Sequence, residues 1–200
     1  SNNFGDAINP YVIALGTGIQ ASNVVYEDVN SDRYKIVSCG SILQHCKKSI
    51  VVGAGLAMPT DGLPSKDSAV VCTRGRLTYE ICQKAKIHAK TYGEPALLLR
   101  DYVTKSQKRN QRSIAILPHY IDQSQFNRFD DLLNRDAEFV NILLPDVTEW
   151  LTYLNGFSLI VTSSLHGMVC GAILNLPVVW VSFQNSPISK HRFKFYDFLS

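Results

Sequence analysis

Short apolar runs alternate with segments of helical periodicity along most of this chain. The runs of strand length lie at residues 34–38, 50–54, 69–73, 113–117, 139–144, 157–162 and 178–183. Near the start, Ile8, Tyr11, Val12 and Leu15 recur at the spacing of a helix, and Pro10 is tolerated in its first turn. Strands that alternate with helices predict an α/β fold with parallel sheets.

The same pattern places further helices between the strands. They are predicted from Ser41 onward and over residues 75–85, 125–135, 146–155 and 164–175. Leu77, Ile81 and Ala85 form the predicted apolar stripe of the helix at 75–85, and Asp146 is placed to cap the helix that follows it.

One polar segment interrupts this alternation. Residues 104–112 (TKSQKRNQR) contain no apolar side chain and indicate a linker. We therefore predict two Rossmann-like domains, at residues 1–103 and 113–200, that face a cleft. The first half does not open with a strand, and the chain stops without an evident helix cap. We expect it to be shortened at one or both ends.

Composition narrows the functional classes. Hydrophobic residues make up 46% of the 200 residues and the formal net charge is +3, which suits a packed core and an anionic small ligand or membrane surface. The sequence has no basic stripe with interleaved aromatic residues, which is the pattern that would indicate nucleic-acid binding. No apolar run reaches membrane-spanning length, and no metal-ligand spacing is found. No signal peptide precedes Ser1, although the true start could be missing.

The cysteines indicate a reducing compartment. All five lack CxxC spacing, and their number is odd. They predict reduced and mostly buried thiols in a cytoplasmic protein, with neither a disulfide nor a zinc site.

The strongest candidate site is residues 163–167 (SSLHG). This turn follows a buried apolar strand and begins a helix, so it lies where open α/β sheets bind ligands. Hydroxyl and backbone N–H groups at a helix start favour an anion. His166 lies off the apolar stripe, where it could donate to a phosphate or transfer a proton. A plain N-cap with a surface histidine fits the spacing equally well. The predicted ligand-binding residues of this turn are Ser163, Ser164 and Gly167.

Four other segments carry candidate chemistry. Arg74 and Arg76 begin a helix after a strand and could hold a carboxylate or a phosphate, although an exposed basic turn is slightly favoured. His119 also follows a strand, but a lone histidine is more often structural. Asn3 and Asp6 lie near a helix start, where capping of the helix is the favoured role for Asp6 and ligand binding the alternative. Basic and aromatic residues alternate over residues 191–197, which include Lys194 and fit either ligand binding or an amphipathic edge.

Taken in order, these segments resemble the polysaccharide pyruvyl transferase family. The matching stretches are NFGDAINPYVIALG, GSIL, VVGAGL, TRGRLT, GEPALLL, IAILPHYID, VTSSLHGMVCGAILNLPVVWV and RFKFYDFLS, and they span essentially the whole chain. Bacterial exopolysaccharide members of the family are the most similar in their IPHY-like and FKF-Asp-like segments.

The resemblance implies a fold, a reaction and its partners. Family members look like GT-B proteins, with two Rossmann-like domains around the site. The donor would be phosphoenolpyruvate. The acceptor would be a hexose of a surface glycan, free or as a lipid-linked oligosaccharide, and the product a pyruvate ketal. No cofactor is implied. By this likeness Arg74 and His166 contact the donor. We expect a cytoplasmic protein, with peripheral association at the inner face of the membrane as the alternative.

Two positions depart from the family pattern. Some relatives carry an arginine where this chain has Ser164, which shifts the expected donor binding toward Arg74, Arg76 or Lys194. Relatives usually carry aspartate where Glu94 stands, in a turn that we expect to be structural. Two alternatives stay open: a GT-B glycosyltransferase that uses a nucleotide sugar, because fold alone does not fix function, and a non-catalytic glycan-binding descendant.

Overall fold

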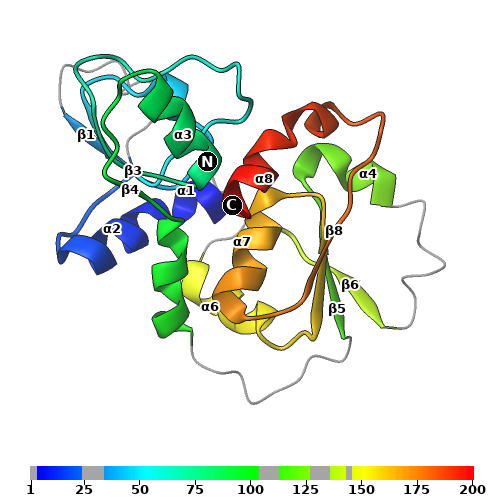
Figure 1. The fold of residues 1–200 in the computed structure, drawn as a ribbon. Coiled ribbons are helices and arrows are strands. Elements are labelled where there is room, and N and C mark those ends of the chain that lie inside the picture. Colours follow the sequence, from blue (N-terminus) through cyan, green and yellow to red (C-terminus); the bar gives the residue numbers. More distant parts are fainter. Residues whose placement is uncertain (1–3, 24–33, 104–112, 127–135, 143–145) are drawn as a thin grey trace. The chain divides into compact units, whose positions relative to one another are not determined.

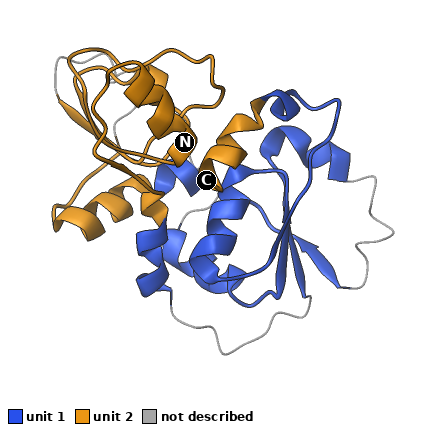
Figure 2. Cartoon of the chain, in the orientation of Figure 1, with its two compact units in different colours: residues 1–7, 97–190 blue, residues 8–96, 191–200 orange. Residues whose placement is uncertain are grey.

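A computed structural model describes residues 4–23, 34–103, 113–126, 136–142 and 146–200. It divides into two compact units, shown in Figure 2. Unit 1 consists of residues 1–7 and 97–190, and unit 2 of residues 8–96 and 191–200. Residues 1–7 are thus grouped with the second part of the chain, and residues 191–200 with the first part. The predicted linker at 104–112 lies outside the described residues.

Unit 2 contains a parallel sheet of four strands in the order β1-β2-β3-β4 (Figure 1). The strands are β1 (Lys35–Val37), β2 (Ser49–Val52), β3 (Ala69–Thr73) and β4 (Thr91–Tyr92). Val51 of β2 and Val70 of β3 are buried neighbours in the ladder and belong to the core of this unit. The observed strands confirm three predicted ones, and β4 is additional.

Among its described residues, unit 2 has the helices α2 (Asn9–Thr17), α3 (Arg76–Lys84) and α8 (Phe193–Phe198) and a short 3₁₀ helix, η2 (Leu43–His45). α2 ends at Thr17, and Gly18 follows it in the left-handed conformation (φ 71°). Asn9 ties this helix to the segment after β1, because its Oδ1 accepts a hydrogen bond from the Cys39 backbone at 2.8 Å.

Unit 1 contains the second parallel sheet, in the order β6-β5-β7-β8 (Figure 1). The strands are β5 (Ile114–Leu117), β6 (Ala137–Phe139), β7 (Leu159–Thr162) and β8 (Val178–Trp180). The chain passes from β5 to β6 on one side and then crosses β5 to reach β7 on the other. This order reverses direction between β5 and β7.

Helices cover both faces of this sheet. α6 (Val147–Leu154) and α7 (Leu165–Leu174) lie side by side on one face (Figure 1). α4 (Gln123–Phe126) supplies Phe126, which packs with Ile116 on the opposite face. The unit also holds α1 (Phe4–Ala7) and the 3₁₀ helices η4 (Tyr120–Asp122) and η6 (Pro187–His191). A further 3₁₀ helix, η3 (Pro95–Tyr102), begins at the end of unit 2 and continues into unit 1.

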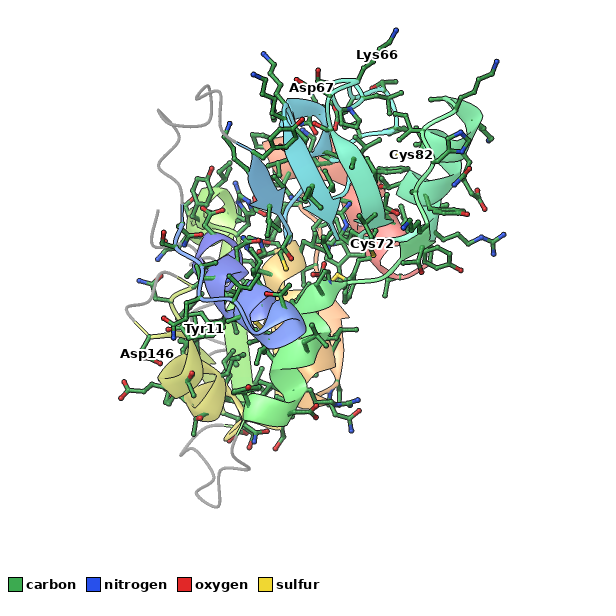
Figure 3. The ribbon with its side chains drawn as sticks, turned by 90° about the vertical axis from the view of Figure 1, so that its left-hand side faces the viewer. Tyr11, Lys66, Asp67, Cys72, Cys82 and Asp146 are labelled. Carbon is green, nitrogen blue, oxygen red and sulfur yellow. The ribbon has the colours of Figure 1, made fainter. Side chains whose placement is uncertain are left out.

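The predicted helix caps are confirmed in unit 1. Asp146 lies at the start of α6 (Figure 3), where its Oδ1 accepts hydrogen bonds from Thr148 and Glu149, each at 2.8 Å. α7 begins after Ser164 and ends at Asn175, which takes the left-handed conformation (φ 55°). Two four-stranded parallel sheets with flanking helices confirm the α/β class and are consistent with two Rossmann-like halves. The GT-B-like cleft stays a prediction.

Two predicted elements are wrong. The helix expected from Ser41 is only the turn η2, because Leu43 donates its backbone N–H to Gly55 at 3.1 Å instead of continuing a helix. The strand expected over 139–144 begins two residues earlier, where Ala137 pairs with Ile114 of β5, and it ends at Phe139. Residues 143–145 lie outside the described part.

One further helix prediction needs a correction, and another stays untested. The buried face of α3 consists of Thr78 and Cys82, whereas Ala85, expected in the apolar stripe, is exposed. Thr78 is buried because its hydroxyl has a polar partner, and periodicity of apolar residues cannot reveal such a position. Of the helix expected over 125–135, residues 127–135 lie outside the described part.

The five cysteines are all free thiols. Cys39, Cys46, Cys82 and Cys170 are buried and Cys72 is partly exposed. Figure 3 shows Cys72 on β3 and Cys82 on α3. Burial raises the pKa of the Cys46 and Cys82 thiols to about 11, so both are expected to be protonated at neutral pH. Within the described residues, no helix is long and apolar enough to cross a membrane.

Candidate active site

The reversal of strand order in unit 1 marks where a ligand site is expected. In open α/β sheets, ligands bind outside the carboxyl ends of the strands, at the point where the order reverses. Here that point lies between β5 and β7, which pair in register up to Leu117 and Thr162. His119 follows β5, and residues 163–167 follow β7. Two of the segments selected from the sequence therefore meet at one edge of the same sheet.

The turn between β7 and α7 is built around Thr162. Its hydroxyl donates to the Leu117 carbonyl at 2.6 Å, which ties the ends of β5 and β7 together, and accepts from the Ser164 backbone at 2.9 Å. Gly167 packs directly on this threonine, and a Cβ at that position would overlap its hydroxyl. Gly167 is thus needed for the close approach of α7 to β7.

Both serines of this turn are buried and accept backbone hydrogen bonds. Ser164 caps α7 by accepting from the His166 N–H at 3.2 Å. Ser163 accepts from the His119 N–H at 3.0 Å. The geometry therefore gives both serines a part in shaping the turn and joining it to the segment after β5. A direct role in ligand binding stays a prediction.

His119 begins the 3₁₀ helix η4. Its Nδ1 accepts a hydrogen bond from the Ile121 N–H at 3.3 Å, so this nitrogen is unprotonated in that arrangement. Its ring also packs against Tyr120, with centroids 4.5 Å apart. η4 is held from the other side by Asp122, a buried carboxylate that accepts a hydrogen bond from the Ser186 hydroxyl.

His166 lies in the first turn of α7 and is half-buried. Its ring meets the ring of Phe4 edge to face, with centroids 6.3 Å apart and an interplanar angle of 65°. The glycine that follows Phe4 also touches this ring, because a Cβ at Gly5 would overlap Nε2 and Cε1 of His166. The NFGD and SSLHG segments, 160 residues apart in the sequence, are therefore brought together within unit 1.

The acidic residue of the NFGD segment does not cap a helix as expected. Asp6 is exposed and lies inside the four-residue helix α1, two positions after its first residue. The prediction failed because α1 begins at Phe4, one turn before the longer helix that the periodicity indicated. Asn3 lies outside the described residues. A role of Asn3 or Asp6 in binding stays a prediction.

Arg74 lies at the end of β3 in unit 2 and is 2% exposed. Its Nε and Nη2 donate to one carboxylate oxygen of Asp197 at 3.1 and 2.8 Å. The remaining contacts are to the Ser41 hydroxyl at 2.6 Å and the Leu56 carbonyl at 2.7 Å. The guanidinium is thus a buried, hydrogen-bonded partner of an internal carboxylate.

Asp197 occupies the position where a donor anion was expected. Its carboxylate also accepts from the Thr78 N–H at 2.7 Å and the Thr78 hydroxyl at 2.8 Å, in the first turn of α3. A helix start combined with an arginine is an anion site, and here the anion is an aspartate of the same chain. From the sequence, Asp197 belongs to the candidate segment 191–197, but its pairing with Arg74 is not predicted. The signal was an acidic residue in the apolar segment FKFYDFL, where a buried charge needs a partner.

The other two basic candidates of unit 2 are more accessible. The side chain of Arg76 is 61% exposed and pairs with Glu80 one helical turn later, at 2.8 Å. Lys194, in the first turn of α8, is half-buried, and its Nζ lies 5.3 Å from the centre of the Phe195 ring. Either of them could reach an anion more readily than Arg74.

Glu94 and Cys39 are neighbouring ionisable side chains in unit 2. Burial raises the pKa of the Glu94 carboxyl above its ordinary value, while hydrogen bonds and the positive charge of Arg74 oppose that rise. The neighbouring Cys39 thiol has its pKa raised well above the ordinary value by burial and by the charge of Glu94. A protonated thiol is a poor nucleophile, so Cys39 is suited to packing and hydrogen bonding.

Apart from Asn3 and Asp6, the predicted site residues fall into two groups. His119, Ser163, Ser164, His166 and Gly167 come together at the carboxyl edge of the unit 1 sheet, whereas Arg74, Arg76 and Lys194 belong to unit 2. Across the described ranges, no group of three histidine, cysteine or acidic side chains is arranged to hold a metal ion.

Comparison with known proteins agrees with the segments singled out in the sequence. The family model for polysaccharide pyruvyl transferase matches residues 8–185. The chain is 25% identical over 206 residues to "Uncharacterized protein L143" of Acanthamoeba polyphaga mimivirus, which covers 99% of this chain and 70% of that protein. No solved structure matches the chain.

Proposed function

Because the chain belongs to the polysaccharide pyruvyl transferase family, we propose that it transfers the enolpyruvyl group of phosphoenolpyruvate to a hexose of a glycan and closes a pyruvate ketal. The observation that supports a catalytic site most directly is the meeting of His119 and the SSLHG turn where the strand order reverses between β5 and β7. That edge combines proton-transfer groups with the start of a ten-residue helix, α7.

The reaction needs proton transfer and charge stabilisation. A proton is added to the methylene carbon of phosphoenolpyruvate, which leaves an oxocarbenium-like centre at the neighbouring carbon. One sugar hydroxyl attacks that carbon and loses its proton to a base. The carbon–oxygen bond to phosphate then breaks, and a second hydroxyl closes the ketal with loss of its own proton. The products are the ketal and inorganic phosphate, so the atoms balance without a redox partner.

We assign the principal acid or base role to His166, with His119 as the competing residue. His166 is half-buried in the first turn of α7, next to the amino-terminal end of the helix, where a phosphate would be stabilised. General acid–base assistance by one well-placed group is typically worth roughly 10²–10⁴-fold in rate. The backbone N–H groups at the start of α7 would help to hold the departing phosphate.

Donor binding also needs fixed positive charge. Phosphoenolpyruvate carries a phosphate and a carboxylate, and Arg76 and Lys194 are the basic candidates that a ligand could reach. We propose that these two take the donor-binding role first assigned to Arg74, since the Arg74 guanidinium is already bound to Asp197. Arg74 then contributes by holding α8 and α3 in place.

The acceptor follows from the family description. We propose a glycan or a lipid-linked oligosaccharide as acceptor, which would place the reaction in the cytoplasm or at the inner face of the membrane. The mildly basic net charge of +3 is compatible with an acidic membrane surface. A nucleotide-sugar glycosyltransferase and a glycan-binding protein without turnover are the alternatives that an experiment must separate.

A thermal-shift panel separates these alternatives. A ligand that binds only the folded protein raises its stability by about 2.7 kcal/mol at one hundred times the dissociation constant. We expect phosphoenolpyruvate to raise the unfolding temperature more than inorganic phosphate does at equal concentration, and nucleotide sugars to leave it unchanged. Stabilisation by a nucleotide sugar without any effect of phosphoenolpyruvate would contradict the proposed donor. An oligosaccharide that stabilises alone would favour the glycan-binding alternative.

A further inference from the structure

We propose that helix α1 positions the His166 imidazole, and that residue 5 must be glycine because the ring occupies the space that any side chain there would need. This inference rests on the proposed function in one respect, since it takes His166 to be the group that moves a proton. The contact between Gly5 and the imidazole is a feature of unit 1 alone.

α1 is anchored firmly enough to act as a support. Phe4 is 1% exposed and packs on the ring of Trp150, with centroids 4.8 Å apart and an interplanar angle of 37°. Its backbone N–H donates to the Ile142 carbonyl at 3.2 Å. Trp150 is fixed in turn, because its indole N–H donates to the Asn141 carbonyl at 3.0 Å. α1 is therefore tied to α6 and to the segment that follows β6.

This anchored helix meets the imidazole at two points. The ring of Phe4 contacts the His166 ring edge to face, and the backbone of Gly5 lies against its Nε2 and Cε1 atoms. The backbone end of His166 is fixed separately, by the capping bond from its N–H to Ser164. With its backbone held by α7 and its ring bounded by α1, the side chain has few rotamers left. A proton-transfer group must be held in one geometry to work.

The contact with the His166 ring explains why position 5 needs a glycine. The atoms that a new Cβ would meet belong to the imidazole and not to a backbone, so the His166 ring would have to move to make room. Gly5 has no positive φ, so alanine causes no backbone strain there. Gly5→Ala should therefore displace the ring while leaving the fold in place. This is the pattern expected of a positioning residue and not of a purely structural one.

The experiment compares Gly5→Ala with a matched control, Gly93→Ala. A Cβ at Gly93 meets nothing within 4 Å, so this control changes the same atoms at an open position. The imidazole signals of His166 are followed by side-chain ¹⁵N–¹H NMR and assigned with His166→Gln. Turnover is followed as phosphate release from phosphoenolpyruvate, with a panel of p-nitrophenyl glucoside, galactoside and mannoside as acceptors.

We expect Gly5→Ala to shift the His166 signals and to lower kcat by roughly 10²-fold, the effect of a displacement of about 1 Å in a catalytic group. The KM for phosphoenolpyruvate and the unfolding temperature should stay near those of the wild type. Gly93→Ala should change none of these quantities. Phe4→Leu is the second variant, since it keeps an apolar side chain but removes the ring contact. It should shift the same signals and lower kcat less.

Three results would overturn the inference. The first is a Gly5→Ala protein with wild-type His166 signals and wild-type kcat. The second is a Gly5→Ala protein that is less stable but whose folded fraction turns over normally. The third is an effect of Phe4→Leu on stability without any shift of the His166 signals. A wild-type protein that forms no ketal would contradict the proposed function instead, and the NMR comparison would still decide whether Gly5 positions the ring.

Discussion

Breaking the buried pair between Arg74 and Asp197 is expected to destabilise the protein by about 3–5 kcal/mol, because the remaining partner is left as an uncompensated buried charge. The side chains are 1% and 0% exposed, so water cannot replace the lost partner. Asp197→Asn should cost nearly as much as Arg74→Ala, although it changes few atoms. Urea unfolding monitored by circular dichroism measures both losses.

The same chain offers a matched control. Arg76→Ala removes a surface arginine whose pair with Glu80 is exposed, and such pairs contribute about 0.2–1 kcal/mol. The double variant Arg74→Met with Asp197→Leu removes both charges and should recover part of the loss, because the buried N–H and hydroxyl of Thr78 still lose their acceptor. If Asp197→Asn unfolded at the same urea concentration as the wild type, the ion pair would not hold unit 2 together.

This outcome also bears on the role of Arg74 in donor binding. An arginine that anchors phosphoenolpyruvate would lower donor affinity when it is removed from a protein that stays folded. An arginine that clamps α8 against the start of α3 would lower stability first. The two effects are separated by calorimetric titration of phosphoenolpyruvate at a temperature where the Arg74→Ala protein is still folded.

Replacing His166 by alanine is expected to lower kcat by roughly 10²-fold or more if this residue moves a proton. The fold should persist, since His166 is half-buried and its backbone cap to Ser164 needs no side chain from position 166. Steady-state rates of phosphate release, combined with circular dichroism of the variant, measure both expectations.

Two companion variants separate the roles of the histidines. His166→Gln can still donate a hydrogen bond but cannot transfer a proton at neutral pH, so substantial retained activity would indicate binding and not acid–base catalysis. His119→Ala tests the competing residue, which follows the neighbouring strand β5. If a folded His166→Ala protein turned over at the wild-type rate while His119→Ala did not, the catalytic role would belong to His119.

The parts of the fold that could be predicted are those in which local chemistry agrees with the packing. The strand at 69–73 and the helix that follows Asp146 were located correctly, because apolar runs and a capping aspartate signal them within a few residues. Parallel strands followed by helices also placed the SSLHG turn at a carboxyl edge without knowledge of the strand order. The strand order, which the sequence does not show, is what makes this edge a candidate ligand site.

The parts that could not be predicted depend on partners distant in the sequence. Asp197 binds Arg74 across 123 positions, and Gly5 touches His166 across 161, so no local window contains either contact. Residues 1–7 group with unit 1 and residues 191–200 with unit 2. A single linker in the sequence does not indicate that the two chain ends belong to these units. The burial of Thr78 in α3 could not be predicted from apolar periodicity, because its hydroxyl is satisfied by Asp197, a distant residue in α8.

One measurement tests pyruvyl transfer most directly: phosphorus and proton NMR of the wild-type protein with phosphoenolpyruvate and the hexoside panel. The proposed function predicts that the phosphoenolpyruvate signal is replaced by inorganic phosphate only when an acceptor is present. A new methyl singlet of a ketal should appear in equal amount, and both changes should be slowed by His166→Ala. Phosphoenolpyruvate that stays intact while a nucleotide sugar is consumed with the same acceptors would contradict it.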